Sequence, residues 1–383
     1  MGPLTSRHGY AALAESVYLN QASLGLIPAE TVEVMVRHLT ETAQHGNLHL
    51  TDDQELHILD GLRQVGAVLL GAPLECVAVL GGASEGLAVA ASLIGGGEVV
   101  LVPSDFPSVT YPWLVATAPD EPHRPVKWVD DRPDRDLTDA LVEAIRPGVA
   151  AVCVSAVMYA TGSQIDCARV ASRAHEVGAR LIVDATQLAG AGVVDMTRWD
   201  ADVVVTSGYK WLSSHGGVAL LALAHDLLDA LSPHPCWMGA DQPFAFDARH
   251  LRPAPGARRF EQSTLAYVSA LGLTQSVTGL NALGYEAIET HARLLAEKLV
   301  DAVESLGWRP FRSLNDPSAS AHIVALSHPD LDAAAVRRTL HYEHRVVTSA
   351  RQDAIRISLH VYNDSSDIDV LANALTVIGE GRA

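Results

Sequence analysis

Short apolar runs alternate with amphipathic segments between about residue 75 and residue 225. Seven runs rich in Val, Leu and Ile predict buried strands, at residues 75–80, 98–102, 126–129, 149–157, 181–183, 202–205 and 217–223. Amphipathic stretches predict helices from residue 84 onward, at 136–145 and at 167–177. Strands that are apolar on both faces and are joined by helices are typical of a mainly parallel sheet with helices on both sides. The pattern therefore predicts an α/β fold with a seven-stranded sheet.

The pattern changes after about residue 225. Residues 231–256 are rich in Pro, His and Asp, and residues 265–306 predict a single long helix, straight or kinked. A smaller α+β unit follows, with strands at 322–326 and 354–359 and helices at 331–341 and 368–378. We therefore predict an N-terminal arm at 1–14, a large domain at 15–285 and a small C-terminal domain at 286–383.

Composition and charge narrow the function classes. The chain has 383 residues, 48% of them hydrophobic and 19% charged, which is typical of a globular protein. Its net charge of -18 repels phosphate backbones and anionic headgroups, so neither nucleic acid nor a membrane is an expected partner. The four cysteines are far apart and form no C-x-x-C pair, so no metal site is expected. The N-terminal residues show no signal sequence, which predicts a cytoplasmic protein.

Candidate chemistry follows three of the predicted strands, at the edge where ligands bind open α/β sheets. Asp184 ends an apolar run, and a carboxylate there requires a cation or strong donors. Lys210 follows another strand within a Gly/Ser turn, where limited access to water lowers a lysine's pKa and makes its amine nucleophilic. Residues 81–85 form a glycine-rich turn that contains Ser84, at the start of a helix whose free N–H groups suit a phosphate.

Together these features supply a lysine for an imine, an acid for a ring nitrogen and a cradle for a phosphate, which are the requirements of pyridoxal 5'-phosphate (PLP). The turn is neither a Walker A loop nor a dinucleotide fingerprint. Each feature also has a purely structural alternative. Asp184 could cap a turn, Ser207 could belong to a simple turn, Phe106 could be a core aromatic residue, and Arg356 could form a surface ion pair.

Five motifs, in this order along the chain, resemble the class V aminotransferase family of fold type I PLP enzymes: Ser84-Glu85, Asp184-Ala185-Thr186-Gln187, Ser207-Gly208-Tyr209-Lys210, Arg259-Phe260-Glu261-Gln262-Ser263-Thr264 and Arg356-Ile357-Ser358-Leu359. The resemblance runs from about residue 18 to residue 369. The family contains cysteine desulfurases, selenocysteine lyases, isopenicillin N epimerases and kynureninases. Membership implies a homodimer with shared active sites and a small amino-acid substrate.

The resemblance also implies a role for each matching residue. Lys210 would hold PLP and move the substrate's α-proton, Asp184 would pair with the pyridine nitrogen, and Arg356 would bind the substrate carboxylate. Gln187 would contact the phenolic oxygen, and Phe106 would stack on the ring. The remaining cofactor contacts would be Ser84, Glu85, Ser207, Tyr209 and, from the partner subunit, the residue at position Thr264. Gln21 and His215 are further candidate substrate contacts, although His215 could equally be a surface loop residue.

Departures from the family pattern narrow the reaction. Cysteine desulfurases carry a persulfide-forming cysteine shortly before the arginine, whereas residues 345–354 contain none, and Ala156 stands where desulfurases have an asparagine. Residues 351–363 resemble the isopenicillin N epimerase-like branch and its C–S lyase relatives. We therefore predict β-elimination from a thioether-linked (S-conjugated) cysteine. Alternatives are an epimerase, an aminotransferase, decarboxylative or oxidative chemistry on the same PLP adduct, and a non-catalytic PLP-fold binding protein.

Overall fold

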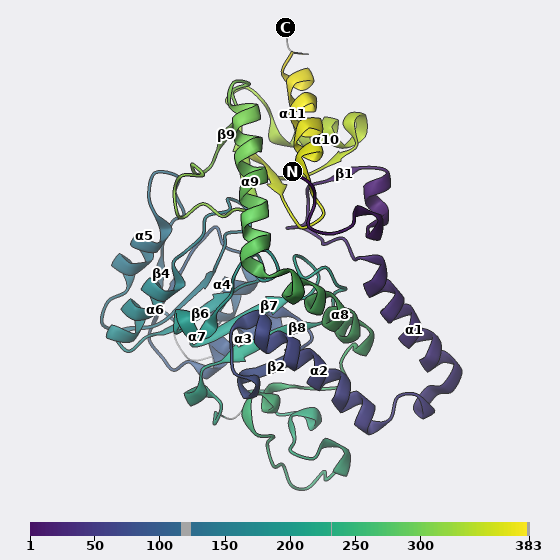
Figure 1. Cartoon of the computed structure of the whole chain (residues 1–383). Coiled ribbons are helices and arrows are strands. Elements are labelled where there is room, and N and C mark those ends of the chain that lie inside the picture. The colour runs from purple at the N-terminus through teal and green to yellow at the C-terminus, as the bar shows by residue number, and fades with distance from the viewer. Residues whose placement is uncertain (116–123, 231, 381–383) are drawn as a thin grey trace.

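A mixed seven-stranded sheet forms the centre of the computed structural model, which describes residues 1–115, 124–230 and 232–380 (Figure 1). Its strand order is β2-β8-β7-β6-β5-β3-β4, and β8 runs antiparallel to both neighbours while the other pairs are parallel. The prediction of a mainly parallel seven-stranded sheet is confirmed. The strands are β2 (Val77–Leu80), β3 (Glu98–Leu101), β4 (Val126–Trp128), β5 (Val149–Ser155), β6 (Arg180–Asp184), β7 (Val203–Ser207) and β8 (Ala219–Leu223).

Successive side chains of these strands enter two separate hydrophobic cores, as the alternation of a strand requires. Val204 belongs to one core, while its neighbours Val203 and Val205 belong to the other. The first core receives side chains from α2 (Asp52–Leu70), α5 (Leu137–Ala144), α6 (Cys167–Glu176) and α8 (Tyr267–Leu283). The second receives them from α3 (Ala83–Leu93) and α4 (Pro107–Leu114). Burial on both faces explains why the strands read as continuous apolar runs.

The segment predicted as one long helix forms two helices, α8 and α9 (Tyr285–Glu304). They are separated by Gly284, whose φ of 82° lies in the left-handed region. α9 leads away from the main sheet toward a second unit (Figure 1). That unit contains the sheet β12-β13-β10-β9 and two helices. Its elements are β9 (Arg309–Pro310), β10 (Ile323–Ser327), α10 (Ala333–His344), β11 (Val346–Val347), β12 (Ser349–Arg351), β13 (Ala354–Ser358) and α11 (Ser365–Glu380).

A third hydrophobic core, formed by residues from 292 onward together with Leu19, supports the proposed division into a large and a small domain. Residues 381–383 of the predicted small domain, and residue 231 of the Pro-, His- and Asp-rich stretch, lie outside the described residues. The sequence prediction contained no counterpart for α1 (Ala29–His45), α2, α4 and the short α7 (Met196–Trp199), or for 3₁₀ turns such as η8 (Gly256–Phe260).

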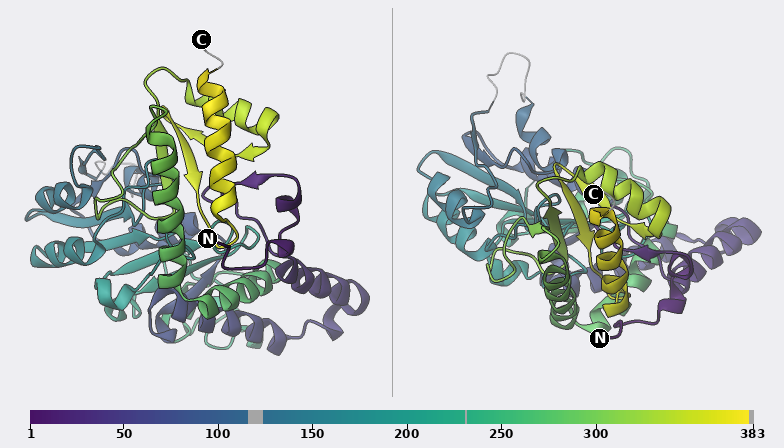
Figure 2. Two further views of the ribbon diagram at one scale, coloured as in Figure 1. Left: turned by 45° about the horizontal axis from the view of Figure 1, so that its top comes forward. Right: turned by 90° about the horizontal axis from the view of Figure 1, so that it is seen from above.

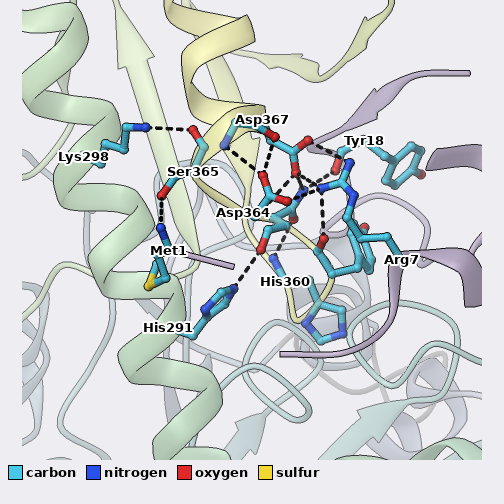
Figure 3. A network of polar contacts seen from close by, with 12 residues as sticks. Met1, Arg7, Tyr18, His291, Lys298, His360, Asp364, Ser365 and Asp367 are labelled. Atoms are coloured by element: carbon cyan, nitrogen blue, oxygen red, sulfur yellow. Dashed lines mark hydrogen bonds and ion pairs between the residues drawn. The ribbon is translucent and has the colours of Figure 1, made fainter. Parts of the chain in front are cut away.

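The N-terminal arm packs against the small domain (Figures 2 and 3). Arg7 donates two hydrogen bonds to the Asp367 carboxylate of α11, at 2.8 and 3.0 Å, and the Met1 ammonium donates to Ser365 Oγ at 3.0 Å. β1 (Val17–Tyr18) then pairs in parallel with β11. The first residues of the chain are therefore fixed to its last helix. In the described part of the chain, no helix is long and apolar enough to span a membrane.

Candidate active site

A cavity of about 200 Å³ lies at the carboxyl ends of β5, β6 and β7. The parallel register aligns Ser155 with Asp184 at the ends of two strands, and Lys210 follows the third. The structure brings seven predicted site residues to the cavity wall: Ser84, Phe106, Asp184, Gln187, Ser207, Tyr209 and Lys210. The wall also contains Gly81, Gly82 and Ala83 of the glycine-rich turn that was predicted to hold a phosphate, and Thr186 of the Asp184 motif. Sequence reasoning assigned no role to the remaining wall residues, which are Ser108, Ser155, Tyr159, Gly216, Gly217 and Val218.

Lys210 is buried, with 8% of its surface exposed. Burial lowers the pKa of its amine to about 8, Asp184 opposes this shift, and Arg356 and Arg351 add to it. Burial raises the pKa of the Asp184 carboxyl. The backbone N–H of Thr186, which donates to Asp184 Oδ1 at 2.8 Å, partly opposes this rise. The cavity therefore contains a lysine with a weakened preference for its charged form and a carboxylate that benefits from a cationic partner.

Hydroxyl groups and a helix N-terminus form one end of the cavity. Ser84 lies in the first turn of α3, and its Oγ is 2.7 Å from Ser108 Oγ. Ser207 Oγ lies 3.2 Å from Thr186 Oγ1. Glu85 does not line the cavity, because its carboxylate accepts the Gly81 N–H at 2.9 Å and so shapes the glycine turn. Hydroxyls beside free helix N–H groups are suited to a phosphate.

The buried carboxylate of Asp105 accepts hydrogen bonds from two residues of the cavity wall, Phe106 and Ser155. Asp105 accepts the N–H of Phe106 at 2.6 Å and both the N–H and the Oγ–H of Ser155, at 2.8 and 2.6 Å. Burial raises the pKa of Asp105 to about 7 despite these donors. The Phe106 ring, 42% exposed, has its centre 5.5 Å from Lys210 Nζ and makes an edge contact with Tyr159. Asp105 thereby fixes the position of the aromatic face next to the lysine.

Gln187 has a defined amide orientation. The indole N–H of Trp211 can only donate, and it donates to Gln187 Oε1 at 2.8 Å. The Nε2 group therefore points the other way and donates to the Ala22 carbonyl at 3.2 Å. His322 of the small domain has its Nε2 2.6 Å from the backbone carbonyl oxygen of Gln187. Gln187 therefore lies at the cavity wall with its amide held in one orientation.

Gln21, predicted as a substrate contact, does not line the cavity. Its side chain is fully buried, and Nε2 donates to the Lys210 carbonyl at 2.9 Å and to Ser213 Oγ at 3.0 Å. Its Oε1 accepts from the Leu26 N–H and the Tyr362 hydroxyl. Because all these groups are already paired within the protein, Gln21 holds the lysine's backbone instead of facing a ligand.

Besides Glu85 and Gln21, three further predicted residues lie outside the cavity wall. His215 is exposed, with Nδ1 3.0 Å from the Gly216 carbonyl oxygen, and Thr264 is exposed after η8. Arg356 is only 1% exposed and donates to the Tyr159 carbonyl at 2.6 Å and to Ser23 Oγ at 2.5 Å. Its Nε has no partner, and no ion pair to a described acid is formed. Burial is the main reason that the pKa of the Arg356 guanidinium is lowered to about 9, and the nearby charge of Arg351 is the second. A buried guanidinium with an unpaired N–H is suited to a carboxylate from outside the protein.

The residues present fit the cofactor that the sequence resemblance implies. Lys210 supplies a buried amine, Asp184 a carboxylate in need of a cation, Gln187 an amide donor, and the start of α3 a set of phosphate-type donors. In the described residues, no group of His, Cys, Asp and Glu side chains is arranged to hold a metal ion.

Comparisons with known proteins identify the family and the fold of this chain. The model of the family "Aminotransferase class-V" matches residues 17–371. The cysteine desulfurase CsdA of Escherichia coli is 26% identical over 402 residues, covering 97% of this chain and 96% of that protein. An apo cysteine desulfurase from Thermococcus onnurineus superposes with a TM-score of 0.86 at 20% identity, covering 98% and 97% of the two chains. The cystine C–S lyase C-DES, in complex with cysteine persulfide, superposes with a TM-score of 0.83 at 20% identity, covering 96% and 98%. These structures share the fold of this chain.

Proposed function

The chain belongs to the aminotransferase class-V family of PLP-dependent, fold type I enzymes, and on this premise we propose that it cleaves the C–S bond of S-conjugated cysteines by β-elimination. The overall conversion takes the conjugate and one water to a thiol, pyruvate and ammonium. Bound PLP would supply the electron sink that makes the α-proton acidic. Two of the similar proteins are named a cysteine desulfurase and a cystine C–S lyase. Both names refer to sulfur-containing amino acids, which supports this substrate class.

The observation that carries the proposal is the absence of a thiol at the site. None of the residues that line the cavity is a cysteine, and Cys76, Cys153 and Cys167 are buried in the protein core. Residues 345–358, which include Arg356 and the strands β12 and β13 joined by a two-residue turn, contain no cysteine. Without a protein thiol to accept sulfur at the site, sulfur would leave with its own substituent, as a free thiol.

We assign the roles as follows. Lys210 would attach PLP and then move the α-proton, a task that requires an amine able to be neutral near pH 7 to 8, and Asp184 would keep the pyridine nitrogen protonated. Arg356 would clamp the α-carboxylate. Gln187 would donate to the phenolic oxygen, and Phe106 would stack on the ring. Ser84, Ser207 and Tyr209 would bind the phosphate.

A homodimer would complete this site. Ser84 and Phe106 are exposed in the single chain, and Thr264 lies on the surface, so a partner subunit could add its Thr264 to the phosphate contacts. Glu261, three residues earlier, is buried and paired with Arg63, which fixes the start of this segment. Sedimentation of the purified holoenzyme would test the dimer directly.

The test of the reaction uses holoenzyme and S-ethylcysteine, with pyruvate and ethanethiol measured together. Equal amounts of both products are expected. Lys210→Ala should abolish them, whereas Lys127→Ala, a lysine on β4 at the far edge of the sheet, should leave the rate unchanged. Solvent deuterium at the α-carbon without pyruvate would favour an epimerase. Amino transfer to an added keto acid, or release of carbon dioxide, would point to the other reactions. A protein that remains colourless with added PLP would refute the cofactor assignment.

A further inference from the structure

Two arginines of the small domain converge on one hydroxyl group. Arg356 Nη2 lies 2.5 Å and Arg351 Nη2 lies 3.3 Å from Ser23 Oγ. Arg351 also donates to the Ala350 carbonyl, and neither arginine forms an ion pair with a described carboxylate. Two like charges that share a single neutral acceptor repel each other, so this arrangement is stabilised when anions approach.

The strand register explains why both guanidinium groups are on the same side. Ser349 is paired with Arg356, and Arg351 with Ala354, in the β12–β13 hairpin. Because alternate residues of a strand share a face, Ser349, Arg351 and Arg356 all project from one face of the small sheet. Ile355 and Ile357 project from the opposite face into the small-domain core. The hairpin turn has only two residues, Gln352 and Asp353, so Arg351 sits at a short, defined tip.

This face also carries buried polar atoms that lack partners. Arg356 Nε, Ser349 Oγ and Ser358 Oγ are buried and make no hydrogen bond within the described protein. Buried polar atoms are normally paired, so several orphans on one sheet face indicate a surface that receives hydrogen bonds from a ligand or from water. Arg356 is also fully buried, which makes an unmatched charge there especially costly.

The pairings assigned so far leave Arg351 without an anionic partner. The phosphate of PLP would lie at the α3 end, its ring nitrogen would pair with Asp184, and its aldehyde would be attached to Lys210. The α-carboxylate of an amino acid then accounts for Arg356. Arg351 lies close enough to influence both Lys210 and Arg356 electrostatically, yet no group of an ordinary S-alkyl cysteine would pair with it.

We propose that Arg351 binds a second acidic group of the substrate, so that this enzyme selects conjugates whose sulfur substituent ends in a carboxylate. The inference rests on the proposed function for the identity of the reaction, but not for the existence of the second anion site. Arg356 and Arg351 would hold the two acidic groups of one ligand, and Ser23 would keep the two guanidinium groups apart and oriented.

Binding without turnover tests the site itself. Succinate and butyrate have the same number of carbons and differ in the second carboxylate, and their dissociation constants for holoenzyme can be compared by isothermal titration calorimetry. We expect succinate to bind about tenfold to a hundredfold more tightly, the range for a charge-assisted hydrogen bond. Arg351→Gln should remove this difference and leave butyrate binding unchanged. The control Arg338→Gln, an exposed arginine of α10, should preserve it.

Turnover tests the selectivity. S-carboxymethylcysteine should have a higher kcat/KM than S-ethylcysteine, mainly through a lower KM, and Arg351→Gln should equalise the two. Arg351→Glu should reverse the charge preference and favour S-(2-aminoethyl)cysteine, which also shows that the variant is folded.

Two outcomes would overturn the proposal. One is equal binding of succinate and butyrate to the unmodified holoenzyme. The other is an equal loss of both ligands in Arg351→Gln, which would mean that Arg351 only assists the shared carboxylate. If no S-conjugated cysteine is cleaved while the Arg351-dependent preference for succinate persists, the elimination reaction is refuted and the second anion site stands.

Discussion

The burial of Lys210 sets the pH at which the apoprotein should take up PLP. Only the neutral amine attacks an aldehyde, and the pKa of this amine is lowered from 10.5 to about 8. This lower pKa raises the neutral fraction of the amine near pH 7 by on the order of 10² over that of an exposed lysine. We therefore expect the rate constant of covalent PLP attachment to rise about tenfold per pH unit below the pKa and to level off above about pH 8.

Two variants test how the neighbouring charges contribute to the lowered pKa of Lys210. Arg356→Gln removes a cation that lowers the pKa of Lys210, so the midpoint should move up and attachment at pH 7 should slow. Asp184→Asn removes an anion that raises it, so the midpoint should move down. Attachment would be followed by borohydride reduction and mass spectrometry of protein stripped of PLP, with Arg338→Gln as control. A midpoint near 10, or shifts in the same direction for both variants, would refute the electrostatic reasoning.

Three further predictions concern turnover and stability. Asp184→Asn should retain covalently bound PLP but slow exchange of the substrate's α-proton with solvent deuterium by on the order of 10²; unchanged exchange would remove Asp184 from its assigned role. Arg63→Met should lower the free energy of unfolding by about 3–5 kcal/mol, because it leaves Glu261 buried without its cation. Urea denaturation measures this, and Arg63→Met combined with Glu261→Leu should recover part of the loss. Arg7→Ala should lower the free energy of unfolding by about 1–3 kcal/mol, because the buried Asp367 carboxylate loses the arginine that donates two hydrogen bonds to it. Limited proteolysis of this variant should cleave the N-terminal arm faster.

The sheet could be predicted from the sequence because every central strand is buried on both faces, so apolar runs and strands coincide. α1 escaped the same reasoning because its apolar residues do not report its packing. Val32, Val36 and Leu39 are 43%, 53% and 55% exposed, while Thr31 and His38 are buried. The break between α8 and α9 was missed as well. Gly284 interrupts an otherwise continuous helical pattern, and its positive φ shows only in the structure.

Sequence reasoning could likewise find only some of the residues of the candidate site. Asp184, Ser207 and Lys210 could be found because each ends or follows an apolar run, and parallel topology brings such positions together. Ser155 also ends a strand in the structure, but it was missed because the apolar run predicted a strand that continues to residue 157. The position of Gln21 could not, because its hydrogen bonds join it to residues 189 and 341 positions away, and no local pattern encodes such distances.

The short segment at residues 19–25 joins the cofactor side of the site to the substrate side. Its Gly25 N–H donates to the Tyr209 carbonyl beside the lysine, and its Leu19 carbonyl accepts the Ser358 N–H of the small-domain sheet. Gln21 holds the backbone of Lys210, while Ser23 contacts both arginines. A movement of the small domain that displaced this segment would therefore disturb the lysine and the arginines together. Since Arg7 fixes the preceding arm to α11, the N-terminal residues hold the sheet face that carries the two arginines in a fixed position relative to Lys210.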